Sequence, residues 1–315
     1  MNWIRFSLLL LIIFLPAGCT RQTAPKENDY AAWVDPFIGT DGHGHTFPGA
    51  TLPFGMVQVS PDTRWENWDG SSGYHYSDKT IMGFSHTHLS GTGAPEYCDI
   101  LLMPTVGEVQ IIPGEEEDSK TGYRSAFSHD NEVASPGYYS VLLDDYNVKA
   151  ELTATTRSGF HRYTFPASKM SNIILDIKNR DHVIESNIQI ISDTKVTGLR
   201  RSKRWAADQY VYFYAKFSKP FNACGIALND TLIDGIRNAE GQNIRAFFQF
   251  ETKENEPIMV KVGISAVDVD GARKNLEAEN RGWNFDRVAK NAREAWNALL
   301  SKIEVEGGTE KQRRI

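Results

Sequence analysis

The sequence is poor in three features that would assign a function quickly: cysteine, clustered positive charge and metal-binding spacings. Its 315 residues contain three cysteines, and neither a CxxC nor an HExxH pattern occurs, which argues against a zinc site. The net charge is −6 and the pI about 5.8. Basic residues cluster only at 195–204 and in the last five residues, so nucleic acid is not an expected partner.

The longest apolar run is too short to span a bilayer comfortably. It covers residues 8–15, follows Arg5, and is succeeded by the small residues Ala17 and Gly18 before Cys19, which is typical of a secretory signal. The Cys19 environment resembles the bacterial lipobox, with Pro16 where leucine is usual. That resemblance implies acylation of Cys19 and an exported lipoprotein of the bacterial cell envelope, in the outer membrane and facing the periplasm or the surface. An ordinary secretory cleavage is the alternative.

Residues 1–18 are therefore predicted to be a lipoprotein signal peptide. Residues 19–29 carry no large apolar side chain and are predicted to be a tether. The two remaining cysteines, Cys98 and Cys224, could pair in an oxidising compartment, or they could be two buried thiols, because both lie in apolar surroundings. The sequence leaves both possibilities open.

Residues 106–265 consist of strand-length alternating runs separated by turn residues. Aromatic and β-branched residues dominate the runs, and no helical pattern separates them, so the fold class is mainly β, an antiparallel β-sandwich. Predicted strands cover 137–143, 148–154, 159–165, 172–177, 209–217, 244–250 and 257–265. Short strands at 55–59 and 99–103 are predicted among long loops.

The hydrophobic period becomes helical after Asp268. Helices are predicted at about 271–280 and 284–303, separated by Gly282. Apolar residues of the second helix form one stripe that needs a covering surface: Phe285, Val288, Ala292, Ala295, Trp296, Leu299 and Ile303. We therefore expect a sandwich domain over 30–268 and C-terminal linker helices over 269–315. An uncovered part of the stripe would favour self-association.

Residues 35–107 are dense in glycine, histidine and aromatics. Five of the eight histidines lie there: His43, His45, His75, His86 and His88. Glycine permits tight loops, His and Asp bind hydroxyls, and Trp offers a flat apolar face. For any single histidine a structural role is the simpler interpretation, but the cluster favours a polar binding surface.

Four segments carry a specific resemblance: DPFIGTDGHGHTFPGATLPFGMVQ, GYHYSD, GFSHTHLSGTG and LLMPTVG. They resemble the N-terminal domain of glycoside hydrolase family 92, the calcium-dependent, inverting exo-α-mannosidases. The resemblance continues through GFHRYTFP, DQYVYFYAKFSKPF and WNALLSKIEVEG. It implies a galactose-mutarotase-like supersandwich, linker helices and then a large α/α barrel, with the active site between sandwich and barrel.

In that family the catalytic carboxylates and most calcium ligands belong to the barrel, and this chain ends where the barrel helices should begin. The resemblance therefore implies calcium as the cofactor, α-mannoside glycans as partners, and the barrel domain as a further partner if it is encoded separately. No catalytic or metal-ligating residue is expected in this chain, which should not turn over mannosides alone.

The chain is expected to supply one wall of the sugar subsite. Trp65 or Trp68 would stack on the sugar, and His86, His88, Asp41 and Glu96 would contact its hydroxyls. The two tryptophans could equally be core residues. The segment GTGAPEYCD departs from the family, where an aspartate is expected near Glu96 and a glycine near Cys98, which puts the Glu96 contact in question.

Two other functions remain open. One is a standalone carbohydrate-binding surface lipoprotein without catalysis. The other is a mutarotase-like epimerase, which would need a paired general acid and base.

Overall fold

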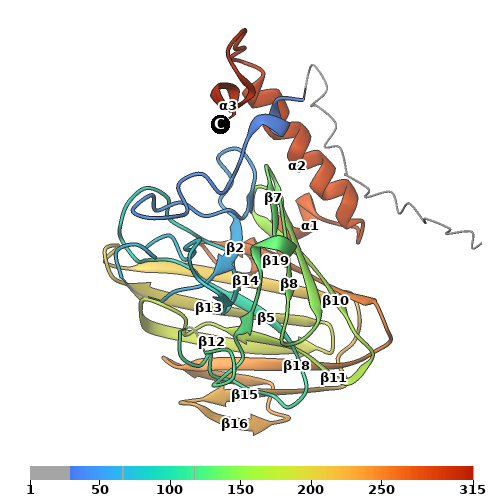
Figure 1. The fold of residues 1–315 in the computed structure, drawn as a ribbon. Helices are drawn as coiled ribbons and strands as arrows, with labels where there is room; N and C mark the ends of the chain where they lie inside the picture. The colour runs from blue at the N-terminus through green and yellow to red at the C-terminus, as the bar shows by residue number, and fades with distance from the viewer. Residues whose placement is uncertain (1–28, 66, 117, 315) are drawn as a thin grey trace, which may run out of the picture.

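The computed structural model describes residues 29–65, 67–116 and 118–314. The predicted signal peptide and the acylation site Cys19 lie outside these residues. The described chain forms two large antiparallel sheets, with helices gathered at one end of the molecule (Figure 1). Within that part of the chain, no helix is both long enough and apolar enough to cross a membrane.

In the described residues the first large sheet has eight strands. Their spatial order is β1 (Ala50–Thr51), β2 (Gln58–Asp62), β4 (Gly83–Ser85), β5 (Leu101–Val106), β11 (Ser168–Asp176), β18 (Ile244–Thr252), β15 (Ala223–Leu228) and β16 (Thr231–Asp234). The second, again counted over the described residues, has nine strands. Their order is β17 (Asn238–Gly241), β12 (His182–Ser192), β13 (Lys195–Lys203), β14 (Gln209–Phe217), β19 (Glu256–Ser265), β10 (Ser158–Phe165), β9 (Val148–Ala154), β8 (Tyr138–Leu143) and β7 (Val133–Ser135). A small pair joins β3 (Thr80–Ile81) to β6 (Ser125–Ala126).

The core lies between the two large sheets. Phe84 of the first sheet packs against Tyr163 of the second with ring centroids 6.1 Å apart, and Phe248 packs against Phe217 at 4.9 Å. All four rings belong to one continuous buried cluster. Aromatic side chains that interdigitate from two facing sheets define a sandwich, which confirms the predicted fold class.

The predicted bounds of the long alternating strands agree with the structure, whereas the short strands beside the loops begin later than predicted. The predicted strands at 148–154 and 209–217 coincide with β9 and β14. The strand predicted at 55–59 is β2, three residues later, because Phe54 adopts φ +59° and the Gly55 N–H closes a turn onto the Leu52 carbonyl. Similarly, β5 begins after Ile100, whose φ is +58°.

The basic stretch at 195–204 is a strand of the second sheet. β13 occupies all of it except its last residue, and Arg200 within it is completely buried. The cluster is therefore not a continuous basic surface patch, because its central cation faces the interior.

The C-terminal helices begin at capped positions. α1 (Val269–Glu279) follows Asp268, whose side chain accepts from the Gly271 N–H, and α2 (Phe285–Leu300) follows Asn284, whose side chain accepts from the Arg287 N–H. Short helical turns complete the described elements: η1 (Tyr30–Trp33), η2 (His129–Asn131) and α3 (Glu310–Arg313).

The apolar stripe of α2 is covered over its first half. Phe285 and Val288 pack with Phe160 of β10 in a small buried cluster, and Ala292 is also buried. The Trp296 indole N–H donates to the Thr51 carbonyl at 2.6 Å. Ile303 lies beyond the helix and is 78% exposed, so the predicted uncovered surface is limited to this end.

Cys98 and Cys224 are both buried and unpaired. Cys224 lies on β15, whereas Cys98 precedes β5. Of the two possibilities left open by the sequence, the structure supports two buried thiols.

Candidate functional site

Three loops of the glycine-rich block meet at one end of the sandwich. They precede β1, connect β2 to β3, and connect β4 to β5. The Ser72 hydroxyl donates to the Thr46 carbonyl at 2.8 Å, and the Gly91 N–H donates to the His45 carbonyl at 2.6 Å. These bonds join segments far apart in sequence into one surface, as the sequence pattern predicts.

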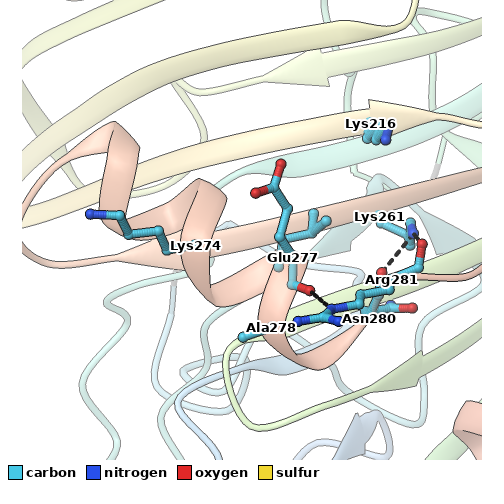
Figure 2. Close-up of a pocket in the computed structure, with 8 residues that line it drawn as sticks. Lys216, Lys261, Lys274, Glu277, Ala278, Asn280 and Arg281 are labelled. Atoms are coloured by element: carbon cyan, nitrogen blue, oxygen red, sulfur yellow. Dashed lines mark hydrogen bonds between the residues drawn. The ribbon is translucent and has the colours of Figure 1, made fainter.

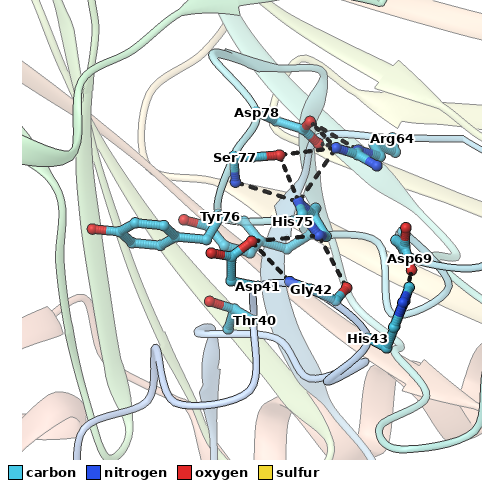
Figure 3. A network of polar contacts seen from close by, with 12 residues as sticks. Thr40, Asp41, Gly42, His43, Arg64, Asp69, His75, Tyr76, Ser77 and Asp78 are labelled. Carbon is cyan, nitrogen blue, oxygen red and sulfur yellow. Dashed lines mark hydrogen bonds and ion pairs between the residues drawn. The ribbon is translucent and has the colours of Figure 1, made fainter.

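A polar network holds the first two loops together (Figure 3). His75 Nε2 lies 3.2 Å from the Gly42 carbonyl oxygen and 3.8 Å from Asp41 Oδ1. Nearby, His43 Nδ1 lies 2.5 Å from Asp69 Oδ1. The hydrogen bond from His43 lowers the pKa of the Asp69 carboxyl, which keeps that exposed group ionised.

Arg64 supplies the positive charge of this network. Its Nε lies 2.8 Å from both carboxylate oxygens of Asp78, and its Nη2 donates to the Ser77 hydroxyl at 3.1 Å. The hydrogen bond to Asp78 raises the pKa of the Arg64 guanidinium. Sequence reasoning included His43 in the histidine cluster but did not single out Arg64 or Asp69, because their pairing depends on how the loops fold.

Two of the predicted sugar-binding residues are accessible. The Asp41 side chain is 70% exposed, and Trp68 is 60% exposed. The Trp68 ring packs edge-on against His45, with centroids 4.7 Å apart. Gly93 lies against the same ring, where an added Cβ would come within 2.5 Å of Cζ3. Trp68 is thus supported from behind while a large part of its surface remains available for stacking.

Trp65 has a different environment. It is half-buried and packs against the main core, and its backbone N–H donates to Glu116 at 3.0 Å. Its indole nitrogen is buried without a partner in the described part of the chain. These contacts agree with the alternative interpretation of Trp65 as a core residue.

Glu96, His86 and His88 lie in the interior, with exposures of at most 2%. Glu96 Oε1 accepts from the Ala206 N–H at 2.7 Å, which ties its loop to the β13–β14 turn. A fully covered side chain offers no face to a sugar hydroxyl. The predicted contact role therefore does not fit these three residues as they lie here.

His86 belongs to a buried chain of neutral groups. Its Nδ1 donates to the Ile100 carbonyl at 2.6 Å, because a carbonyl can only accept. Its Nε2 must then accept from His161 Nε2 at 2.9 Å, and His161 Nδ1 accepts from the Tyr163 hydroxyl at 2.8 Å. Burial lowers the pKa of His86 to about 4 and the pKa of His161 well below its ordinary value. Every ring nitrogen is satisfied with both imidazoles neutral.

His88 belongs to a second buried group. Its Nε2 lies 2.8 Å from Asp62 Oδ1, and Cys98 is the third member. Burial alone would lower the pKa of His88, but Cys98 and Asp62 outweigh it and raise the value to about 10. The three residues are 26 and 10 positions apart, so no local spacing in the sequence could reveal them.

This group does not fit the calcium that the family resemblance implies. Calcium takes six to eight oxygen ligands, and here one donor is a thiol and another an imidazole. Within the described residues it is the single cluster of at least three His, Cys, Asp or Glu side chains with metal-binding spacing. A calcium site supplied by these residues is therefore not supported.

A pocket outside the loop block is larger than the one within it. It has a volume of about 570 Å³ and lies at the end of α1 (Figure 2). Its lining residues are Lys216, Lys261, Lys274, Leu276, Glu277, Ala278, Asn280 and Arg281. Lys261 Nζ donates to the carbonyls of Asn280, Arg281 and Gly282, so it closes the C-terminal end of that helix. The loop block holds a smaller pocket of about 200 Å³ beside Arg64 and Asp78. We assign the candidate site to the loop block because of its exposed aromatic and polar side chains, and not because of the size of its pocket.

The fold and the loop surface define a class: β-sandwich domains that present polar and aromatic side chains at one end. Residues 33–265 match the glycosyl hydrolase family 92 N-terminal domain, and residues 271–315 match the glycosyl hydrolase family 92 catalytic domain. The chain belongs to glycosyl hydrolase family 92.

Solved structures and a curated relative agree with this assignment. A family 92 α-mannosidase of Bacteroides thetaiotaomicron, solved in complex with mannoimidazole, is 40% identical with a TM-score of 0.85, over 89% of this chain and 38% of that one. A family 92 inverting mannosidase of the same species is 26% identical with a TM-score of 0.80, over 92% and 39%. A protein of Arthroderma benhamiae described as an uncharacterized secreted glycosidase is 29% identical over 97% of this chain and 42% of its own length. The chain thus spans about two fifths of these relatives.

Proposed function

We propose that this chain is the N-terminal sugar-binding domain of an exo-α-mannosidase, which hydrolyses terminal α-mannosides with inversion only when joined to its α/α-barrel domain. The observation that carries the proposal is that Trp68 and Asp41 are both exposed on the loop surface, and that Asp41 belongs to the polar network of His75 and Arg64 (Figure 3). Membership of family 92 supports the sugar class. The two solved relatives, an α-mannosidase and an inverting mannosidase, support the substrate.

A physical argument supports placing the sugar-binding wall in this domain and the catalytic groups in the barrel. Inverting hydrolysis needs a carboxylic acid and a carboxylate about 6.5–9.5 Å apart, with room for water between the base and the sugar. The buried carboxylates of the loop block are engaged otherwise: Asp78 binds Arg64, Asp99 binds Arg200, and Asp62 binds His88. Their ion pairs favour fixed structural charges, so we place the acid and the base in the barrel.

Calcium and the membrane anchor belong to the same proposal. We place the calcium ligands in the barrel domain, because the one described donor cluster has the wrong chemistry for this ion. Acylation at Cys19 would hold the protein at the bacterial envelope, either periplasmic or at the surface. The description of the fungal relative as secreted supports export.

Binding is tested by titrating the full chain with methyl α-mannoside in a calorimeter. We expect weak, millimolar affinity, because one wall of a subsite leaves much of the sugar in water. Methyl α-glucoside, the epimer at C2, serves as the matched ligand control. Absence of heat for both sugars at tens of millimolar would contradict a sugar-binding surface.

Turnover is tested separately with 4-nitrophenyl α-mannoside. The chain alone should release no nitrophenol, whereas the same chain extended through a barrel domain should release it and form β-mannose first, visible by NMR. Sugar binding without turnover in both forms would favour the standalone carbohydrate-binding lipoprotein. Turnover by the chain alone would contradict the placement of the acid and the base in the barrel.

A further inference from the structure

The buried group of Asp62, His88 and Cys98 joins three separate segments of the first sheet. Asp62 is the last residue of β2, His88 follows β4, and Cys98 precedes β5. One ligand atom from each residue lies within 4.8 Å of the other two. All three side chains are buried, so the group is closed to solvent.

The surroundings orient the donors toward one another. The His88 Nδ1–H donates to the Gln58 carbonyl at 2.7 Å, which fixes the ring and directs Nε2 toward Asp62. A backbone carbonyl in this role is the usual outer partner of a metal-bound histidine. The Arg180 guanidinium donates to Cys98 Sγ at 3.3 Å, which fixes the orientation of the Cys98 side chain.

One donor atom has no partner in the described chain. Asp62 Oδ2 is fully buried without a hydrogen bond, although Asp62 Oδ1 is engaged by His88. A buried carboxylate oxygen without a partner is unfavourable, because it loses water without gaining a donor. A bound cation would compensate it.

A glycine keeps side-chain atoms away from the three donor atoms. Gly73 has φ +93°, and a Cβ at that position would overlap Asp62 Oδ1 and lie 3.0 Å from His88 Cδ2 and 3.1 Å from Cys98 Sγ. Cys98 itself adopts φ +55°, a left-handed conformation that favours glycine. The chain therefore holds a thiol toward the centre at a cost in backbone strain.

We propose that Asp62, His88 and Cys98 form a structural zinc site. Thiolate, imidazole and carboxylate together suit Zn²⁺ and are a poor set for calcium. The two anionic ligands balance the ion's two charges. The Ser85 hydroxyl oxygen, 3.2 Å from His88 Nε2, offers a fourth ligand for a tetrahedral shell. Because the group is closed, the ion would enter as the chain folds and would clamp β2, β4 and β5 beneath the candidate sugar surface.

The experiment uses the full chain, refolded with either Zn²⁺ or Co²⁺ and washed with a mild chelator. We expect about one ion per chain by mass spectrometry of the metal, as for a single-ion structural site. The cobalt form should show tetrahedral visible bands and a near-ultraviolet sulfur-to-cobalt charge-transfer band. A folded wild-type chain that retains no ion, or retains cobalt without the sulfur band, overturns the proposal.

Matched variants locate the site. Cys98→Gly removes the thiol while relieving the positive φ, so it should fold and should bind zinc at least about tenfold more weakly. Cys224→Ser removes the other buried thiol and should keep the ion and the band. His43→Asn tests adventitious binding at the exposed His43–Asp69 pair. Retention of the ion by Cys98→Gly, or its loss in His43→Asn, would place the metal elsewhere.

Discussion

Trp65 and Trp68 lie three positions apart, yet the structure gives them opposite surroundings. Trp65 packs on the core, and Trp68 leaves most of its ring to solvent. We expect Trp65→Ala to lower the free energy of unfolding by about 2 kcal/mol, less than the 3–5 kcal/mol of a fully buried tryptophan, without changing sugar affinity.

Trp68→Ala should have the reverse effect. The loss of one stacking face should weaken binding of methyl α-mannoside roughly three- to tenfold, and the unfolding midpoint should stay unchanged. Urea unfolding and calorimetric titration of both variants form a matched pair. If Trp65→Ala weakens affinity with unchanged stability, the assignment of the two roles is reversed.

At the residue scale, His161 is expected to make the stability of the fold depend on pH. Its pKa is well below its ordinary value of about 6.5 because it is buried among groups that are satisfied only when it is neutral. Between the folded and unfolded pKa values, the unfolded chain binds the extra proton. Stability from this group is therefore complete above pH 6.5 and is lost as pH falls below it, at up to about 1.4 kcal/mol per pH unit.

Urea unfolding at roughly ten pH values between 7.5 and 5 measures the slope of the free energy of unfolding against pH. The variant His161→Phe keeps a ring but cannot take up a proton, so its slope should be smaller than that of the wild type. His182→Asn, at an exposed position, is the control and should leave the slope unchanged. Equal slopes for His161→Phe and the wild type would show that His161 does not carry the effect.

The sequence could predict that the loop block is polar and ligand-facing, but not which of its histidines face outward. His86 is satisfied by His161, which is 75 positions away, and His88 by Asp62, 26 positions away. Such partners are brought together by strand pairing and leave no local pattern. Asp41 and Trp68, by contrast, lie in loops where exposure follows from the absence of a hydrophobic period.

At the scale of elements, α2 is held by its first turns. Phe285 is 2% exposed, contacts Phe160 at a centroid distance of 5.3 Å, and lies under the Arg162 guanidinium at 4.3 Å. Phe285→Ala should destabilise the chain by about 3 kcal/mol, at the lower end of values for a buried phenylalanine. Hydrogen exchange of the α2 amides should accelerate most, because this contact docks the helix.

The control for α2 is Ile303→Ala, a loss of apolar surface at an exposed position beyond the helix. It should change stability by no more than about 0.5 kcal/mol. If both variants destabilise the chain equally, the exposed end of the stripe is covered in solution, for example by a second copy of the chain.

Elements were predictable where one face alternates cleanly and difficult where charge interrupts the pattern. β9 alternates apolar and polar residues in its sequence (VKAELTA), β14 is a run of mostly aromatic and apolar residues (QYVYFYAKF), and both were placed to the residue. β12 and β13 were missed, although Ile188 and Ile190 alternate with polar neighbours. In β13 the inward-facing residue Arg200 is charged, so the strand lacks the apolar pattern of a buried face. Its partners Asp99 and Asp181 come from other parts of the chain.

At the scale of the whole molecule, Arg200 connects the loop block to both sheets. It extends from β13 to Asp99 in the loop before β5, with Nη1 2.5 Å from Oδ1, and it also binds Asp181. Its Nε donates to the Ile177 carbonyl just after β11 at 3.1 Å. The loop that carries Glu96 and Cys98 is therefore fixed by a buried ion network rather than by its own sequence.

Removing Arg200 should lower the free energy of unfolding by more than the loss of its hydrogen bonds alone. Arg200→Met leaves two buried carboxylates without a cation, and breaking a buried pair in this way costs about 3–5 kcal/mol. Hydrogen exchange should accelerate at residues 87–99 as well as on β13. Arg273→Met, which removes exposed pairs on α1, is the matched control and should cost at most about 1 kcal/mol.

A double-mutant cycle separates the loss of attraction from the burial of unpaired charge. Adding Asp181→Asn to Arg200→Met removes one of the two stranded charges, so the double variant should be more stable than the sum of the single effects by about 0.5–3 kcal/mol. Urea unfolding of the four proteins at pH 7 gives the coupling. Because protonation also removes a stranded carboxylate charge, the penalty of Arg200→Met should shrink as pH falls. Strict additivity at pH 7 would mean that Arg200 and Asp181 are not energetically coupled, because water or rearrangement relieves the stranded carboxylate.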